Sequence, residues 1–179
     1  MTQDLNNRLI AAITRGVEVR SRAYASIGLE DEQLLGPPAS IEDINLLEKM
    51  CGHALPPSYR AFLCLHNGWR MVDGVSDLLP VQEMLTGPTA KKVRKWQACM
   101  AEEGETALAE GLVVGFGTTA PVCYVLDFSR VDSDGECKVI RCEKIDFFEY
   151  DSFIQWLEES ALEYEEAVNF SEDDDDELS

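Results

Sequence analysis

Residues 55–69 read LPPSYRAFLCLHNGW, and this stretch has the beginning and end of a short helix. Pro57 suits the first helical position, because the N–H group that proline lacks would have no intrahelical partner there. Gly68 fits the position just past the helix end, where the backbone turns left-handed. One helical face carries the residues at i, i+3, i+4 and i+7, which are Tyr59, Phe62, Leu63 and His66. We therefore expect a helix over 57–66 whose apolar face is part of the core.

Two further helices are predicted before this stretch. In residues 5–27 an apolar side chain recurs every fourth residue, and Gly28 follows. The second helix has a capping box at Ser40 and Asp43 and ends at Gly52. Its expected apolar stripe consists of Ile41, Ile44, Leu47 and Met50.

Downstream, residues 69–85 are less regular, and we expect one or two strands interrupted at Asp73-Gly74. After a turn at Gly87-Pro88, residues 89–105 read as an amphipathic helix. The basic cluster on this helix comprises Lys91, Lys92, Arg94 and Lys95. We interpret it as a solvated helix face rather than a phosphate or partner site, because short basic blocks are common on helices.

The last third of the chain shows β-branched and alternating segments typical of strands. They are 112–116, 122–128 and 137–143, with an Asp-Gly hairpin turn within 131–136 and a bend or short strand at 145–150. A final helix is predicted over 151–168. Helices first, then a meandering antiparallel sheet, then a helix indicate an α+β fold. The sheet should pack against the N-terminal helices and the C-terminal helix.

The charge is unevenly distributed along the 179 residues. The net charge is −19, and residues 145–179 hold 14 acidic side chains and no lysine or arginine. Because phosphate contacts need a basic surface, direct nucleic-acid binding is disfavoured. A basic protein is the more plausible partner, since opposite charge accelerates the encounter. The alternative is that the acidic tail only keeps the protein soluble.

Localisation and domain limits follow from composition. No apolar run approaches the ~20 residues of a membrane helix, and the N-terminus lacks the features of a signal peptide, so we expect a cytoplasmic protein without membrane association. Residues 1–28 are predicted to be a helical extension packed on a domain over 29–170. Residues 171–179 have almost no apolar side chain and are predicted to be a disordered acidic tail.

A search of the sequence for chemistry finds no catalytic, cofactor-binding or metal-ligating set. GFGTTAP at 115–121 lacks the spacing and the lysine of a phosphate-binding loop. Cys64 and His66 are two residues apart on a helix and so point to different faces. Neither Cys51 with His53 nor Cys137 with Cys142 has the spacing of a zinc site. We therefore expect a protein that is not an enzyme and needs no cofactor.

The order of elements and one motif resemble the SUKH superfamily, the Smi/Knr-like group. In that family a helix with an Ile and an acidic residue leads to LP, then Tyr, then FL, then NG. The matching residues are Ile41, Glu42, Leu47, Glu48, Leu55-Pro56, Tyr59, Phe62-Leu63 and Asn67-Gly68. An LLPV-like element at 78–81, a glycine-bearing strand pair at 113–128 and an aromatic final helix follow in order. The resemblance covers roughly residues 29–160.

The resemblance implies a non-enzymatic domain and two functions. Most bacterial members look like immunity proteins, which bind and neutralise a toxin delivered between competing cells. Fungal relatives look like regulatory scaffolds, which link partners without inhibiting them. The acidity of the chain favours a basic toxin such as a nuclease for the first function.

A toxin-binding surface needs a few strong anchors, and Trp, Tyr and Arg supply most of these. Trp69 with its polar neighbours Arg70, Asp73 and Asp77 is the first candidate, together with the acidic rim residues Asp132 and Asp134. The alternative is that Trp69 folds back into the core, with Tyr59, Phe62 and Leu63.

Overall fold

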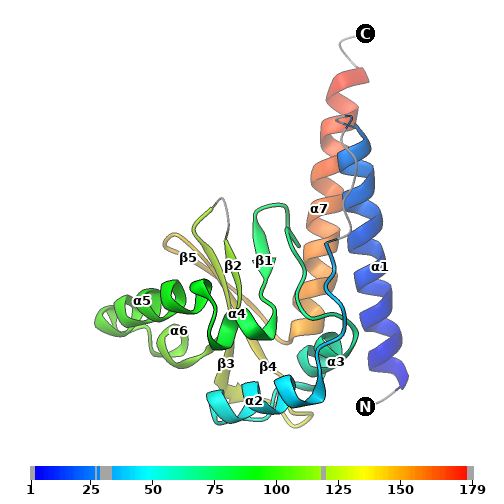
Figure 1. Ribbon diagram of the computed structural model, residues 1–179. Helices are drawn as coiled ribbons and strands as arrows, with labels where there is room; N and C mark the ends of the chain where they lie inside the picture. The colour runs from blue at the N-terminus through cyan, green and yellow to red at the C-terminus, as the bar shows by residue number, and fades with distance from the viewer. Residues whose placement is uncertain (1–2, 27, 29–33, 118–119, 177–179) are drawn as a thin grey trace.

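The computed structural model describes residues 3–26, 28, 34–117 and 120–176. In chain order the elements are α1 (Gln3–Ser26), α2 (Ile41–Cys51), α3 (Pro57–Leu65), β1 (Ser76–Leu78), α4 (Val81–Leu85), α5 (Pro88–Glu103), α6 (Thr106–Glu110), β2 (Leu112–Gly117), β3 (Val122–Val131), β4 (Cys137–Glu143), β5 (Asp146–Tyr150) and α7 (Phe153–Asp176). Figure 1 shows the sheet between α5 and α6 on one side and the α1–α7 pair on the other.

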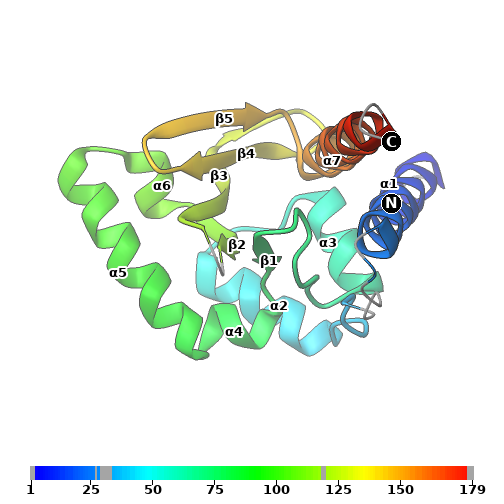
Figure 2. The ribbon, with the colours of Figure 1, turned by 90° about the horizontal axis from the view of Figure 1, so that it is seen from above.

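The sheet is a five-stranded antiparallel meander in the order β1-β2-β3-β4-β5. Seen from above, β5 lies along one edge of the sheet, and β1 forms the opposite edge next to α2 and α3 (Figure 2). One sheet face packs on α7, α3 and α1, and this is the main core. The other face forms a smaller cluster with α5 and α6 around Val125 and Ile140. The expected α+β architecture is confirmed.

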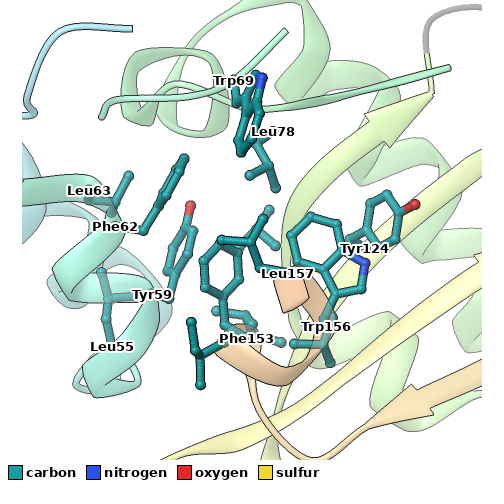
Figure 3. Packing of buried hydrophobic residues seen from close by; sticks show 14 of the residues in the cluster. Leu55, Tyr59, Phe62, Leu63, Trp69, Leu78, Tyr124, Phe153, Trp156 and Leu157 are labelled. Carbon is teal, nitrogen blue, oxygen red and sulfur yellow. The ribbon is translucent and has the colours of Figure 1, made fainter. Parts of the chain in front are cut away.

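The helix that the opening stretch predicts is present as α3, and its apolar face is buried as expected. Tyr59, Phe62 and Leu63 are at most 1% exposed. The Phe62 ring lies 5.4 Å from that of Phe153, and Tyr59 meets Phe153 edge-on at 5.0 Å. Figure 3 shows these rings joined to Trp156 and Tyr124, so α3, α7 and the sheet share one aromatic core.

Gly68 has a different role from the one expected. The helix ends at Leu65, and its C-cap is His66, whose backbone N–H donates to the Phe62 carbonyl, so Gly68 lies two residues beyond the cap. Gly68 has a φ of +93°, and an added Cβ would lie 2.9 Å from the Pro80 nitrogen. The glycine is therefore needed for the close approach of two backbone segments as well as for the left-handed turn.

The helices α1 and α7 form a parallel pair that extends past the sheet (Figure 1). Arg8 pairs with Glu158 at 2.8 Å, and both Arg15 and Arg22 pair with Glu165. The three arginines and the two glutamates recur every seven residues, the repeat that keeps one side of a helix facing its partner. Arg8 pairs with the earlier glutamate and Arg15 with the later one, so the two helices run in the same direction.

Several expectations about individual elements are wrong. Ile41 and Met50 are each 48% exposed, so only Ile44 and Leu47 of the expected stripe enter the core. The short helices α4 and α6 were not expected, since five residues give too little periodicity to recognise. For residues 145–150, where a bend or a short strand was expected, the strand is confirmed as β5.

The last helix is longer than expected. It continues to Asp176, because no glycine or proline follows Phe153 to end it. Residues 171–176 of the tail that we predicted to be disordered are therefore helical, and 177–179 lie outside the described residues. Gly28 and residues 34–40 of the connector are described, and residues 29–33 lie outside the described residues. No helix among the described residues is long and apolar enough to cross a membrane.

Candidate functional site

Trp69, the first candidate anchor, is in the core and is only 2% exposed. Its backbone N–H donates to Leu78 at 3.0 Å, and its carbonyl accepts from the Leu78 N–H at 2.8 Å. A Cβ added at Gly16 of α1 would lie 2.8 Å from Cη2 of the indole ring. Figure 3 shows the ring beside Leu78 at the margin of the aromatic core. The expectation of an exposed anchor is wrong, and the alternative, that Trp69 packs inward, is correct.

The polar neighbours of Trp69 organise a loop. Asp73 accepts hydrogen bonds from the N–H groups of Val75 and Ser76, at 3.0 and 2.7 Å. It also accepts from the Tyr124 hydroxyl, and burial next to this carboxylate raises the pKa of Tyr124. Asp77 accepts from the Met71 N–H at 2.8 Å. Both carboxylates are therefore engaged within the fold, and neither is a free rim charge.

Arg70 is exposed, and its backbone carbonyl connects this loop to α1. Nη1 of the buried Arg20 donates to that carbonyl at 3.1 Å. With Trp69, Asp77 and Pro80, Arg70 also lines a hollow of about 640 Å³ between the loop, β1 and α4. Of the three polar neighbours of Trp69, Arg70 alone is exposed, as an anchor would be.

Asp132 and Asp134 lie elsewhere, in the turn between β3 and β4. The Asp132 carboxylate accepts from the N–H groups of Asp134 and Glu136, each at 2.9 Å. Asp73 is near the start of β3 and Asp132 follows its end, a separation of roughly 20 Å along the strand. The structure therefore does not bring the six candidate residues together. It divides them between opposite ends of the sheet.

The end of the sheet that carries Asp132 is hollowed into a groove of about 580 Å³. We call it the acidic groove. Its lining consists of Asp4, Leu5, Arg8, Pro57, Asp132, Asp134, Glu136, Asp151, Ser152 and Ile154, which include five carboxylates and one arginine. The lining is therefore predominantly negative.

Three of the five carboxylates of the acidic groove lie where helices begin, and Asp132 and Asp134 belong to the β3–β4 turn beside them. Asp4 is in the first turn of α1. Glu136 accepts from the N–H and the hydroxyl of Ser58, at 2.7 and 2.6 Å, and so caps α3. Asp151 and Ser152 precede α7, and Ser152 accepts from the Gln155 N–H at 3.2 Å. Negative side chains are stabilised at helix N-termini. The carboxylates that stabilise these helix starts therefore also give this surface its negative charge.

Partial burial distinguishes Glu136 from the other carboxylates of the groove. Burial raises its pKa, and the hydrogen bonds from Ser58 offset this rise only in part. Lys138 donates to Asp151 at 2.8 Å. Sequence reasoning identified only Asp132 and Asp134 here. Asp4 in the first turn of α1 and Asp151 just before α7 were a local signal for two more, whereas the contact of Glu136 with Ser58 joins residues 78 positions apart.

Other residues that could carry chemistry lie apart from one another. The His53 ring stacks on Phe128 at 4.7 Å, and the Cys51 thiol donates to the His53 carbonyl rather than facing the ring. Cys137 and Cys142 point to opposite sheet faces, one in each cluster. Within the part of the chain that the structure describes, no three His, Cys, Asp or Glu side chains could hold a metal ion. The basic cluster on α5 is exposed at all four positions, as a solvated face would be.

Comparison with known proteins supplies the family. A family model described as the SMI1 / KNR4 family (SUKH-1) matches residues 38–159, about two thirds of the chain. A search of the curated proteins finds no match to this chain. The match runs from before α2 into the first turns of α7, so α1 and most of α7 lie outside it. The chain belongs to the SMI1 / KNR4 family (SUKH-1), the group that its opening motif resembles.

Proposed function

We propose that this protein is an immunity protein: it binds a cognate secreted antibacterial toxin in the cytoplasm and occludes the toxin's active site. Membership of the SUKH-1 family is the observation that carries this proposal. The family resemblance implies that bacterial members neutralise toxins by binding rather than by catalysis.

The surface chemistry supports the same function. The chain has a net charge of −19, and its acidic groove holds five carboxylates beside one arginine. A basic toxin, such as a nuclease whose own surface must attract phosphates, would be drawn to this end of the sheet. Inhibition by occlusion needs no catalytic group on this chain, only a complementary surface.

Co-expression with a candidate toxin tests the proposal; the candidate is sought in the gene next to the one that encodes this protein. Cells that produce the toxin with this protein should survive, and cells that produce the toxin with an empty vector should die. Both cultures need the same toxin level by immunoblotting. Death despite abundant folded protein would remove the immunity function and leave the regulatory scaffold, the second function that the family implies.

A further inference from the structure

One edge of the sheet is covered by a further chain segment, and the other edge is not. The β1 edge is short, and the segment at Trp69 pairs with Leu78 and with Leu35 beyond it. At the other edge, β5 pairs with β4 in continuous register over five residues, without a bulge or a proline. No described element lies beyond β5 in Figure 2, so half of its backbone N–H and C=O groups face outward.

The side chains of β5 are unusually apolar for an uncovered edge. Phe147 and Phe148 are 46% and 48% exposed, and Ile145 in the turn just before the strand is 86% exposed. Phe147 stands opposite Cys142 on β4, and Phe148 opposite Arg141, whose guanidinium lies 5.6 Å from the ring. Consecutive strand residues point to opposite faces, so large rings flank the edge on both sides. Natural sheets usually protect edges with charge, proline or bulges, and contiguous apolar exposure marks interaction sites.

The charge around β5 identifies the kind of partner. Of the four carboxylates in residues 143–151, Glu143, Glu149 and Asp151 pair with Arg141, Arg130 and Lys138, so the negative charge that a partner would meet comes mainly from the acidic groove. The strand leads at Asp151 directly into the acidic groove, so the apolar edge and the groove form one continuous surface. A second copy of this chain would bring a second acidic groove to the same surface, in addition to the −19 that each copy carries. A basic segment meets no such repulsion.

We propose that the outer edge of β5 is the docking site for an extended, basic segment of the toxin, which adds to the sheet as a sixth strand. The inference rests on the proposed function and names the surface that performs it. Backbone hydrogen bonds to β5 hold the segment, Phe147 and Phe148 pack against its alternate side chains, and its basic residues reach the acidic groove.

A pair of substitutions with opposite charge tests both the place and the partner. Phe147→Lys and Phe147→Glu remove the same ring and differ in the charge that they introduce. The affinity of each variant for the toxin, inactivated by a substitution in its active site, is measured by isothermal titration calorimetry. Against a basic segment, Phe147→Lys should weaken binding at least 100-fold, and at least tenfold more than Phe147→Glu. Leu46→Lys, at a 51% exposed residue of α2 on the far side of the sheet, should change affinity less than twofold. Equal melting temperatures establish that all variants are folded.

Amide hydrogen exchange distinguishes failure of the β5 docking site from failure of the proposed function. On binding the toxin, exchange at residues 145–149 should slow at least tenfold. A toxin that binds tightly but leaves these amides and both Phe147 variants unaffected would overturn the β5 site and leave the immunity function intact. A wild-type protein that does not bind the toxin overturns the proposed function itself. Concentration-dependent dimers of the protein alone, dispersed by Phe147→Lys, would show that a second copy occupies the edge instead.

Discussion

The indole ring of Trp69 lies against Gly16 of α1, so closely that an added Cβ would be 2.8 Å from Cη2 of the ring. This contact joins the domain to a helix outside the family match. Next to it, Arg20 of α1 donates to the carbonyl of Arg70 at 3.1 Å. The residue expected to meet a toxin therefore fixes the N-terminal helix in place.

Gly16→Ala tests this contact. In an open helix position the change should stabilise by about 1 kcal/mol. Here the methyl group would meet a buried ring, and overpacking costs typically 1–3 kcal/mol, so we expect a net loss of stability in urea unfolding. In a Trp69→Leu background the clash is absent, and Gly16→Ala should become stabilising. Stabilisation of the wild type by the full ~1 kcal/mol would show that the ring is not packed there.

Phe62 lies at the centre of the aromatic core and has no exposed surface. Phe62→Ala should lower the free energy of unfolding by about 3–5 kcal/mol, the range for an aromatic ring removed from a packed core. Ile41→Ala is the control, because Ile41 is 48% exposed and should cost less than about 1 kcal/mol. A loss below ~1 kcal/mol for Phe62→Ala would contradict the packing of α3 on α7.

Asp127 is a buried carboxylate whose effect on stability depends on pH. Burial alone would raise its pKa, but hydrogen bonds from Ser129 and Arg130 outweigh burial and lower it. A lowered pKa in the folded state means that the stabilisation is present above the ordinary pKa of about 3.9 and is lost as pH falls through the folded value. Asp127→Asn should therefore cost about 2 kcal/mol at pH 7 and much less near pH 3.

Urea unfolding at the two pH values measures this difference. Asp134→Asn, in an exposed turn, serves as the control and should change stability by less than about 0.5 kcal/mol at both. A penalty for Asp127→Asn that is the same at pH 7 and pH 3 would contradict the role of its charge.

The acidic groove predicts an effect on the rate of toxin binding. Asp134→Asn removes an exposed charge at the rim without disturbing the carboxylate of Asp132, which supports the turn. Association with the inactivated toxin should slow about twofold to fivefold at low salt. The effect should vanish in 0.5 M salt, because screening shortens the reach of the charge. Glu18→Gln on exposed α1 is the control, and an equal slowing by it would assign the steering to net charge rather than to the groove.

Local sequence signals predicted much of this fold. Ser40 accepts from the Asp43 N–H as the capping box requires, and Gly52 is left-handed at the end of α2. The β3–β4 hairpin turns at the expected Asp-Gly pair, with Gly135 at a φ of +85°. Each of these features is decided by neighbours within a few residues, and so the sequence shows it directly.

The placement of the candidate site could not be predicted in the same way. The burial of Trp69 depends on Gly16, 53 positions earlier, and nothing in the local pattern around Trp69 records that contact. The acidic groove depends on three helix starts that meet only in the folded chain. The exposure of Phe147 depends on β5 being the last strand of the sheet, which follows from topology rather than from the alternation of its residues.

Titration of the toxin's activity with this protein is the most direct test of the central claim. The purified candidate toxin is assayed at a fixed concentration while the folded protein is added in steps. The account predicts that activity falls linearly and reaches zero at one molecule of this protein per molecule of toxin. Full toxin activity at a tenfold molar excess of the folded protein would contradict it.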